Sequence, residues 1–168
     1  MNTRHRLAAG AAAGALLLTG TAATVPASAS APSGVTAEQQ GISLVVNART
    51  GIHPSFDRFV VDVKGPLPPI SVKRVKALHY DGSGAKVPLP GKYFLEIKLS
   101  PAAAHNEAGK PVYKGPRLVE PNMPKIKGVA LTGDFEGVVT FGLAFKDRPG
   151  YSTMKLHKPE RFVLDIRR

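Results

Sequence analysis

The feature that most constrains this chain is a strand-like phrase that occurs twice. Residues 57–65 read DRFVVDVKG, and residues 160–168 read ERFVLDIRR. Side chains alternate between the two faces of a strand, so in each copy Phe and two aliphatic residues share one face while Arg and Asp share the other. The phrase therefore predicts two strands, each with one face in a hydrophobic core and a charged face opposite.

The charged face of the repeat predicts a specific pairing. Within a copy, Arg and Asp lie four residues apart, about 13 Å along a strand, and cannot reach each other. If the two copies run antiparallel side by side, Arg58 would lie near Asp165 and Asp62 near Arg161. Opposite charges across neighbouring strands stabilise a sheet. We therefore predict that these four residues form a structural charge ladder, with a docking surface as the alternative interpretation.

The rest of the chain also has the pattern of strands. Short apolar runs separated by Gly, Pro, Asp and Asn predict strands at residues 42–47, 58–64, 70–77, 93–99, 126–132, 138–145, 152–156 and 162–166. We expect one helical turn around residues 102–105 and a long ordered loop up to residue 124. No stretch after the N-terminal segment has a sustained period near 3.6 residues. The predicted fold class is all-β: a single small antiparallel β-sandwich, or else a partly open barrel.

The N-terminal segment has the order of a secretory signal peptide. Arg4 and Arg6 precede an uncharged run of small apolar residues, and Ala27-Ser28-Ala29 provides a processing pattern. We predict a signal peptide over residues 1–29, a flexible arm over 30–40 and one domain over 41–168; a membrane anchor is the alternative for the first segment. The mature protein is expected to be secreted, extracellular or cell-wall associated, with no membrane span.

Composition narrows the chemistry. The chain has no cysteine, so it offers no lipid-modified Cys, thiol nucleophile or Cys-based metal site. Its histidines are scattered without metal-type spacing, and no metal or cofactor is expected. The net charge is +11 and falls to +9 when the two signal-peptide arginines are removed. An exported basic domain is attracted to anionic polymers, although the absence of nucleic-acid-binding motifs makes a wall polymer the expected partner.

A binding role is favoured, and the candidate ligand-binding residues are chosen by charge and position. Arg forks suit carboxylate or phosphate groups, and a Tyr ring can stack on a sugar. The candidates are Arg49, His53, Arg58, Lys73, Arg74, Lys76 and Tyr113. Two alternatives remain open. A small wall hydrolase or lyase would use His53 with Asp57, or Asp134 with Glu136. A protein-interaction partner that regulates a secreted enzyme would use a sheet edge or an apolar patch.

The order of motifs resembles a known family. RTGIHPSFDRFVVDV is followed by DGSG, by a strand ending in LSPAAAH, by GDFEG and by PERFVLDI. This order, over residues 42–168, resembles the AMIN-like domain of secreted actinobacterial proteins, which is similar to the AMIN domains of cell-wall amidases and secretin pores. The resemblance implies a small β-sandwich that localises to the envelope, with peptidoglycan as ligand. Many members are lipoproteins, whereas this chain has no Cys after its signal peptide.

Overall fold

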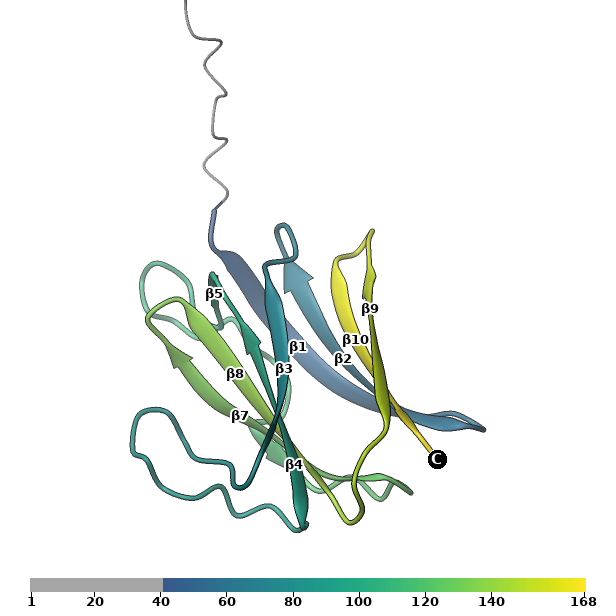
Figure 1. Cartoon of the computed structure of the whole chain (residues 1–168). Coiled ribbons are helices and arrows are strands. Elements are labelled where there is room, and N and C mark those ends of the chain that lie inside the picture. Colours follow the sequence, from purple (N-terminus) through teal and green to yellow (C-terminus); the bar gives the residue numbers. More distant parts are fainter. Residues whose placement is uncertain (1–40) are drawn as a thin grey trace, which may run out of the picture. The chain divides into compact units, whose positions relative to one another are not determined.

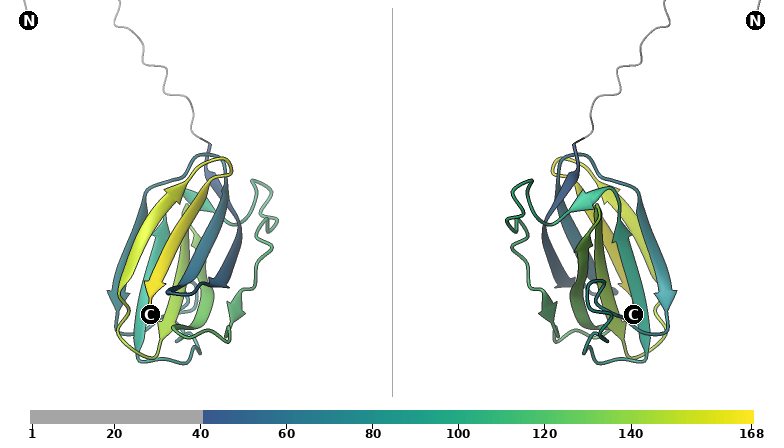
Figure 2. Two further views of the ribbon diagram at one scale, coloured as in Figure 1. Left: turned by 90° about the vertical axis from the view of Figure 1, so that its right-hand side faces the viewer. Right: turned by 90° about the vertical axis from the view of Figure 1, so that its left-hand side faces the viewer.

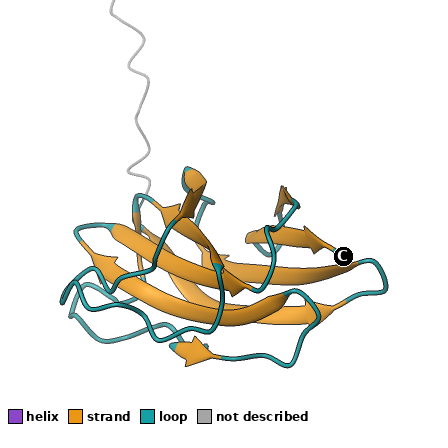
Figure 3. Ribbon diagram, turned by 60° about the horizontal axis from the view of Figure 1, so that its bottom comes forward, coloured by secondary structure: helices purple, strands orange, loops and turns teal. Residues whose placement is uncertain are grey.

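The computed structural model describes residues 41–168, and these residues form a β-sandwich of two five-stranded sheets (Figure 1). The predicted signal peptide and arm lie outside the described residues. Figure 3 shows strands and loops and no helix in this part of the chain. The all-β prediction is confirmed in its sandwich form, because the two sheets are separate and do not close into a barrel.

The first sheet contains both copies of the repeated phrase. Its order is β5-β1-β2-β10-β9, with β1 Ser43–Ile52, β2 Phe56–Lys64, β5 Ala102–Ala103, β9 Tyr151–Leu156 and β10 Arg161–Arg167. The copies lie in β2 and β10, which are adjacent and antiparallel. Only the short β5 pairs in parallel with its neighbour, β1, among the strands of this sheet.

The second sheet covers the apolar face of the first. Its order is β3-β4-β8-β7-β6, with β3 Ile70–Val75, β4 Tyr93–Leu99, β6 Leu118–Val119, β7 Ile126–Phe135 and β8 Val138–Phe145. All of these neighbours are antiparallel. In the left-hand view of Figure 2 the first sheet faces the viewer, and in the right-hand view the second sheet does.

The core lies between the two sheets and is built from the alternating apolar residues of each strand. Phe59 from β2 meets Phe141 from β8 edge to face, with ring centroids 5.6 Å apart, and both are fully buried. Leu95 and Ile97 of β4 and Leu164 of β10 are also fully buried. These contacts realise the one-sided apolar pattern that the repeated phrase predicted.

A second, smaller core lies on the outer face of the second sheet. Residues 76–92, which we call the flap, fold over this face and bury Leu78, Val87 and Leu89 against Phe94, Ala130 and Ala144. Phe94 does point outward, as its position in the strand predicts, yet it is 9% exposed because the flap covers it. Gly142 provides the space for Leu78, since a Cβ there would lie 2.7 Å from a Leu78 methyl.

The two ends of the sandwich carry different loops. At one end, which we call the N-terminal end, β1 begins and the β7–β8 turn lies close to β5, with Ala102 N donating to Gly137 O at 2.8 Å. At the other end, which we call the C-terminal end, β10 ends beside the β1–β2 hairpin. In the second sheet, β4 and β7 begin at this end and β8 finishes there. Figure 1 shows the N-terminal end at the top and the C-terminus below.

The local differences from the predicted elements have clear causes. The expected helical turn around residues 102–105 is wrong: Ala102–Ala103 is the extended strand β5, held by pairing with β1 and by the bond to Gly137. β1 continues through Ile52 because its second half pairs with β2. β7 likewise extends to Phe135, so part of the predicted turn at residues 133–137 is strand. A short strand, β6, interrupts the predicted long loop.

Candidate functional site

The repeated phrase forms half of the expected ladder of ion pairs. In the β2–β10 register Arg58 lies opposite Asp165 and Asp62 opposite Arg161. Arg58 donates from Nε and Nη2 to the two Asp165 oxygens at 2.7 and 2.8 Å. Hydrogen bonding to Asp165 raises the pKa of Arg58 above its ordinary value, although burial opposes the rise. The fork of Arg58 is therefore occupied within the fold.

The other half of the ladder has a different partner. Arg49 of β1 donates to both oxygens of Asp62 at 3.0 Å, whereas Arg161 Nε donates to Pro159 O at 3.3 Å. Thus the expected Asp62–Arg161 ion pair is replaced by one to the opposite neighbour strand. Asp62 can pair with Arg49 because it lies on the central strand β2, which has β1 on one side and β10 on the other. The ladder joins three strands, and the Arg49 fork is also in use.

His53 and Asp57 do not form a catalytic pair in this structure. Asp57 is fully buried; its Oδ2 accepts from Lys125 N at 2.6 Å and from Ile126 N at 3.1 Å, and its Oδ1 from Arg168 at 3.0 Å. His53 instead stacks on Phe56, with centroids 4.4 Å apart. Asp57 thus joins the start of β7 and the C-terminal residue to β2, a structural task.

Three of the predicted ligand-binding cations lie on the other sheet from Arg49 and Arg58. Lys73 and Arg74 are in β3 and Lys76 follows it, at the edge of the second sheet, whereas Arg49 and Arg58 are on the first. Arg74 donates to Pro149 O at 3.0 Å and lies over the Tyr151 ring at 5.2 Å. Arg74 therefore links β3, the edge strand of the second sheet, to the segment that begins β9, the edge strand of the first sheet. Lys73, Arg74 and Lys76 do not lie together with Arg49 and Arg58.

The Tyr113 side chain packs against the edge of the main core. Its ring packs near Phe141, with centroids 5.9 Å apart, and its hydroxyl donates to Pro116 O at 3.0 Å. Burial raises the pKa of Tyr113 to about 12, and the charge of Arg117 opposes the rise. This half-buried position leaves little of the ring free to stack on a sugar.

A polar pair that the sequence did not suggest lies at the N-terminal end. His105 Nδ1 is 2.8 Å from Asp134 Oδ2, and Asp134 Oδ1 accepts from Ala104 N at 2.8 Å. The side chains are 40% and 17% exposed, respectively. Asp134 therefore fixes both the backbone and the side chain of the segment after β5, and it orients the imidazole. Glu136 does not join it, since it occupies the β7–β8 turn with a left-handed φ of 49°.

A third acidic residue reaches the same strand from the flap. Asp81 N donates to Thr132 O at 3.0 Å, and Asp81 Oδ2 accepts from Thr140 Oγ1 at 2.9 Å. The carboxylate occupies the space above Gly133, where a Cβ would overlap it. The second core and these bonds thus hold the flap tip, and with it Asp81, against β7.

These groups surround one open hollow of about 600 Å³, which we call the β7-edge hollow. β6 pairs with Val129 and Ala130, and beyond it Leu131 N donates to Arg117 O at 2.8 Å. The flap tip and the loop after β5 form the sides. The lining comprises Tyr80, Asp81, Gly82, Ser83, His105, Gly109, Pro111, Arg117, Leu118, Leu131, Thr132, Gly133, Asp134 and Phe135. The Phe135 ring is unusual in being 66% exposed.

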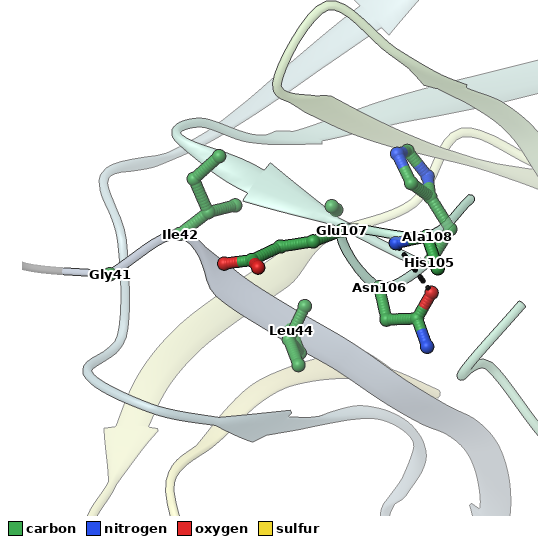
Figure 4. Close-up of a pocket in the computed structure, with 8 residues that line it drawn as sticks. Gly41, Ile42, Leu44, His105, Asn106, Glu107 and Ala108 are labelled. Carbon is green, nitrogen blue, oxygen red and sulfur yellow. Dashed lines mark hydrogen bonds between the residues drawn. The ribbon is translucent and has the colours of Figure 1, made fainter. Parts of the chain in front are cut away.

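An adjoining hollow of about 580 Å³ lies on the other side of His105 (Figure 4). Glu107 extends toward Ile42, which directly precedes β1, and toward Leu44 of β1, while the His105 ring points away from them. Asn106 Oδ1 accepts from Ala108 N at 3.1 Å and shapes the turn. The loop carrying His105 therefore separates a hollow beside β1 from the β7-edge hollow. No group of three metal-type ligands occurs within residues 41–168.

Sequence reasoning missed this site because its members are far apart in the chain. His105 and Asp134 are 29 residues apart, and Thr140 is 59 residues from Asp81. Two local signals were present: an aromatic residue inside a turn motif, GDFEG, and an acidic residue at the start of DGSG. Neither signal shows which distant loops meet there, since that depends on the pairing of β7 with β8 and on the packing of the flap.

A comparison with protein families shows to which family this domain belongs. The AMIN-like domain family matches residues 43–168. The chain belongs to the AMIN-like family. This membership associates the domain with the cell envelope. Among curated proteins and among solved structures, no match was found. Residues 41–168 contain no helix with the length and apolar character needed to span a membrane.

Proposed function

We propose that this AMIN-like protein is a secreted, non-catalytic module that binds cell-wall glycan, with peptidoglycan as ligand, through the β7-edge hollow. The observation that carries the proposal is the exposed Phe135 ring at the rim of a hollow lined by carboxylates, an imidazole and a guanidinium. Leu118 in the same lining is also exposed, and an exposed apolar surface rimmed by polar groups marks ligand-binding grooves.

The lining suits a saccharide chemically. The face of an aromatic ring packs against the apolar face of a sugar, and Phe135 provides that face. Carboxylate oxygens accept hydrogen bonds from sugar hydroxyls, as Asp81 and Asp134 are placed to do. Arg117 adds a donor that can meet an acetamido carbonyl or a stem-peptide carboxylate. Binding sites of this kind combine an apolar surface with a few oriented polar groups.

The polar groups of the hollow are held before ligand arrives. Asp81 is bonded to Thr140 and Asp134 to Ala104, so neither carboxylate must be ordered on binding. Preorganisation lowers the entropic cost of association. This view moves the proposed contact away from Arg49 and Arg58, whose forks already bind Asp62 and Asp165.

The test measures binding of a soluble β-1,4-linked N-acetylglucosamine oligomer by NMR titration and of purified sacculi by co-sedimentation. Phe135→Ala should reduce both signals several-fold. Ile52→Ala is the matched control, because Ile52 is 58% exposed but lies at the C-terminal end. Equal binding by wild type and Phe135→Ala would exclude the hollow as the glycan site.

A small wall hydrolase or lyase is the second candidate, favoured by the contact between His105 and Asp134. A carboxylate that orients an imidazole is a common arrangement for general-base catalysis. The prediction is release of soluble fragments from sacculi by the wild type and not by His105→Gln. Glycan binding without any fragment release would support the non-catalytic module.

A further inference from the structure

A third hollow, which shares no lining residue with the β7-edge hollow, gathers lysines at the C-terminal end of the sandwich. Its volume is about 640 Å³, and we call it the lysine hollow. Lys92 immediately precedes β4, Lys146 immediately follows β8, and Lys127 lies near the start of β7. The lining comprises Pro90, Gly91, Lys92, Glu120, Pro121, Asn122, Lys127 and Lys146.

The β4–β8 pairing brings two of these lysines to the same end of the second sheet. The pairing ends at Tyr93 and Phe145; Lys92 directly precedes Tyr93, Lys146 directly follows Phe145, and Lys92 N donates to Phe145 O at 2.9 Å. Gly91 permits this close approach, because a Cβ there would lie 2.8 Å from Phe145 O. Like charges that line one hollow repel each other, and a bound anion would reduce this repulsion.

The third lysine is directed by an irregularity in β7. The register with β8 shifts between Ile126 and Gly128, which leaves Lys127 as the extra residue of a bulge. Bulges redirect side chains and are frequent next to binding sites. Lys127 Nζ donates to Met123 O at 2.6 Å, and this bond fixes its position in the lining.

The lysine hollow has an excess of positive charge. Within residues 41–168, the ion pairs of Lys and Arg join Arg49, Arg58, Arg168 and Lys98 to carboxylates, and none includes Lys92, Lys127 or Lys146. Glu120 is the single carboxylate in the lining. Lys92 and Lys146 are exposed. The arrangement thus presents three ammonium groups against one carboxylate in an open concavity.

We propose that the lysine hollow binds the phosphate groups of a soluble polyanionic chain, namely a phosphodiester polymer. Lysine ammonium groups bind phosphate as compact point charges with several donors. An open hollow admits successive phosphates of a chain. A lipid surface is the rival occupant, and the experiment has a separate arm for it. The inference is independent of glycan binding, which is assigned to other residues, those that line the β7-edge hollow.

The experiment uses residues 30–168, the chain expected after removal of the predicted signal peptide, with fluorescently labelled poly(glycerol phosphate) as probe and anisotropy as readout. Lys92→Gln/Lys146→Gln should lower the affinity about tenfold and reduce the slope of log affinity against log salt. Lys64→Gln/Lys155→Gln removes the same charge from two exposed positions nearer the N-terminal end and should change the affinity less than about twofold.

Three outcomes would overturn the proposal. The first is an equal loss of affinity in both double variants, which would indicate a non-specific charge effect. The second is unchanged binding in Lys92→Gln/Lys146→Gln with an intact fold by circular dichroism. The third is tighter binding to anionic phosphatidylglycerol vesicles than to the polymer, lost in the same variant, which would assign a membrane. Titration with the neutral glucosamine oligomer, unchanged in both variants, separates this result from glycan binding.

Discussion

Arg58 and Asp165 face each other across β2 and β10 and are joined by two hydrogen bonds of 2.7 and 2.8 Å. Beside them, Val60 lies opposite Val163 on the same outer face, and the two valines are only 6% and 1% exposed. Long charged side chains can cover apolar surface with their aliphatic stems. The ladder therefore contributes to stability by burial as well as by charge.

The Arg58–Asp165 pair should be strongly coupled. In a double-mutant cycle with Arg58→Met and Asp165→Asn, we expect a coupling energy of about 2 kcal/mol in the free energy of unfolding, because the pair is partly buried and makes two charged hydrogen bonds. Urea unfolding followed by circular dichroism measures it. A coupling energy near zero would mean that packing of the stems, not the ion pair, holds this part of the sheet.

The Arg49–Asp62 pair is the internal comparison. Arg49 has a side chain 51% exposed, and both its bonds to Asp62 are 3.0 Å long. Exposed pairs contribute less because water and salt screen them. The equivalent cycle with Arg49→Met and Asp62→Asn should give a coupling energy below about 1 kcal/mol, decreasing in high salt.

Asp57 should be among the most sensitive positions of the domain. Asp57→Ala leaves two backbone N–H groups, of Lys125 and Ile126, and the guanidinium of Arg168 without their acceptor. We expect a loss of about 3 kcal/mol in the free energy of unfolding. Arg168→Ala, which removes the ion pair between Asp57 and the partly exposed guanidinium, should lower the free energy of unfolding by about 1 kcal/mol. Equal losses would show that the two backbone contacts contribute little.

Tyr113 should make stability depend on alkaline pH. Its pKa is raised from 10 to about 12 by burial, so the folded protein favours the neutral phenol more than the unfolded chain does. This contribution is complete below pH 10 and is lost as the pH rises from about 10 to about 12. Tyr113→Phe should reduce that loss and remove a late-ionising phenol from the absorbance titration near 295 nm. An unchanged titration curve would contradict the assignment.

Gly133 should control the shape of the β7-edge hollow. A Cβ at this position would overlap the Asp81 carboxylate, so Gly133→Ala must displace the flap tip. We expect about tenfold weaker binding of the glucosamine oligomer and a loss of about 1–2 kcal/mol of stability. Gly82→Ala, in the same flap tip but with open space at its Cβ, is the control and should bind nearly normally.

The sheets were largely predictable because their information is local. In β4 and β8 the alternation of apolar residues predicted the observed bounds, and the repeated phrase predicted that β2 and β10 would be antiparallel neighbours. The short strands β5 and β6 were not predictable. Two-residue strands have no periodicity, and they form only because backbone groups of distant segments need partners.

The candidate site was less predictable, for a physical reason. Charge identified Arg49 and Arg58 as possible ligand contacts, but the sequence does not show that Asp62 and Asp165 already bind their forks. Asp134 was considered only with its near neighbour Glu136, whereas its partner is His105 on another loop. Residue types indicated possible chemistry, and the tertiary fold determined which side chains were still available for it.

The flap suggests that this domain has two levels of opening. Its small core is attached to the outside of a sandwich that already has a complete interior of its own. Amide hydrogen exchange should therefore show residues 76–92 becoming labelled through a partial detachment, at a lower free energy than the central strands. In such a state Asp81 would be withdrawn from the hollow while the two sheets stayed folded, so recognition could be switched off without unfolding the protein.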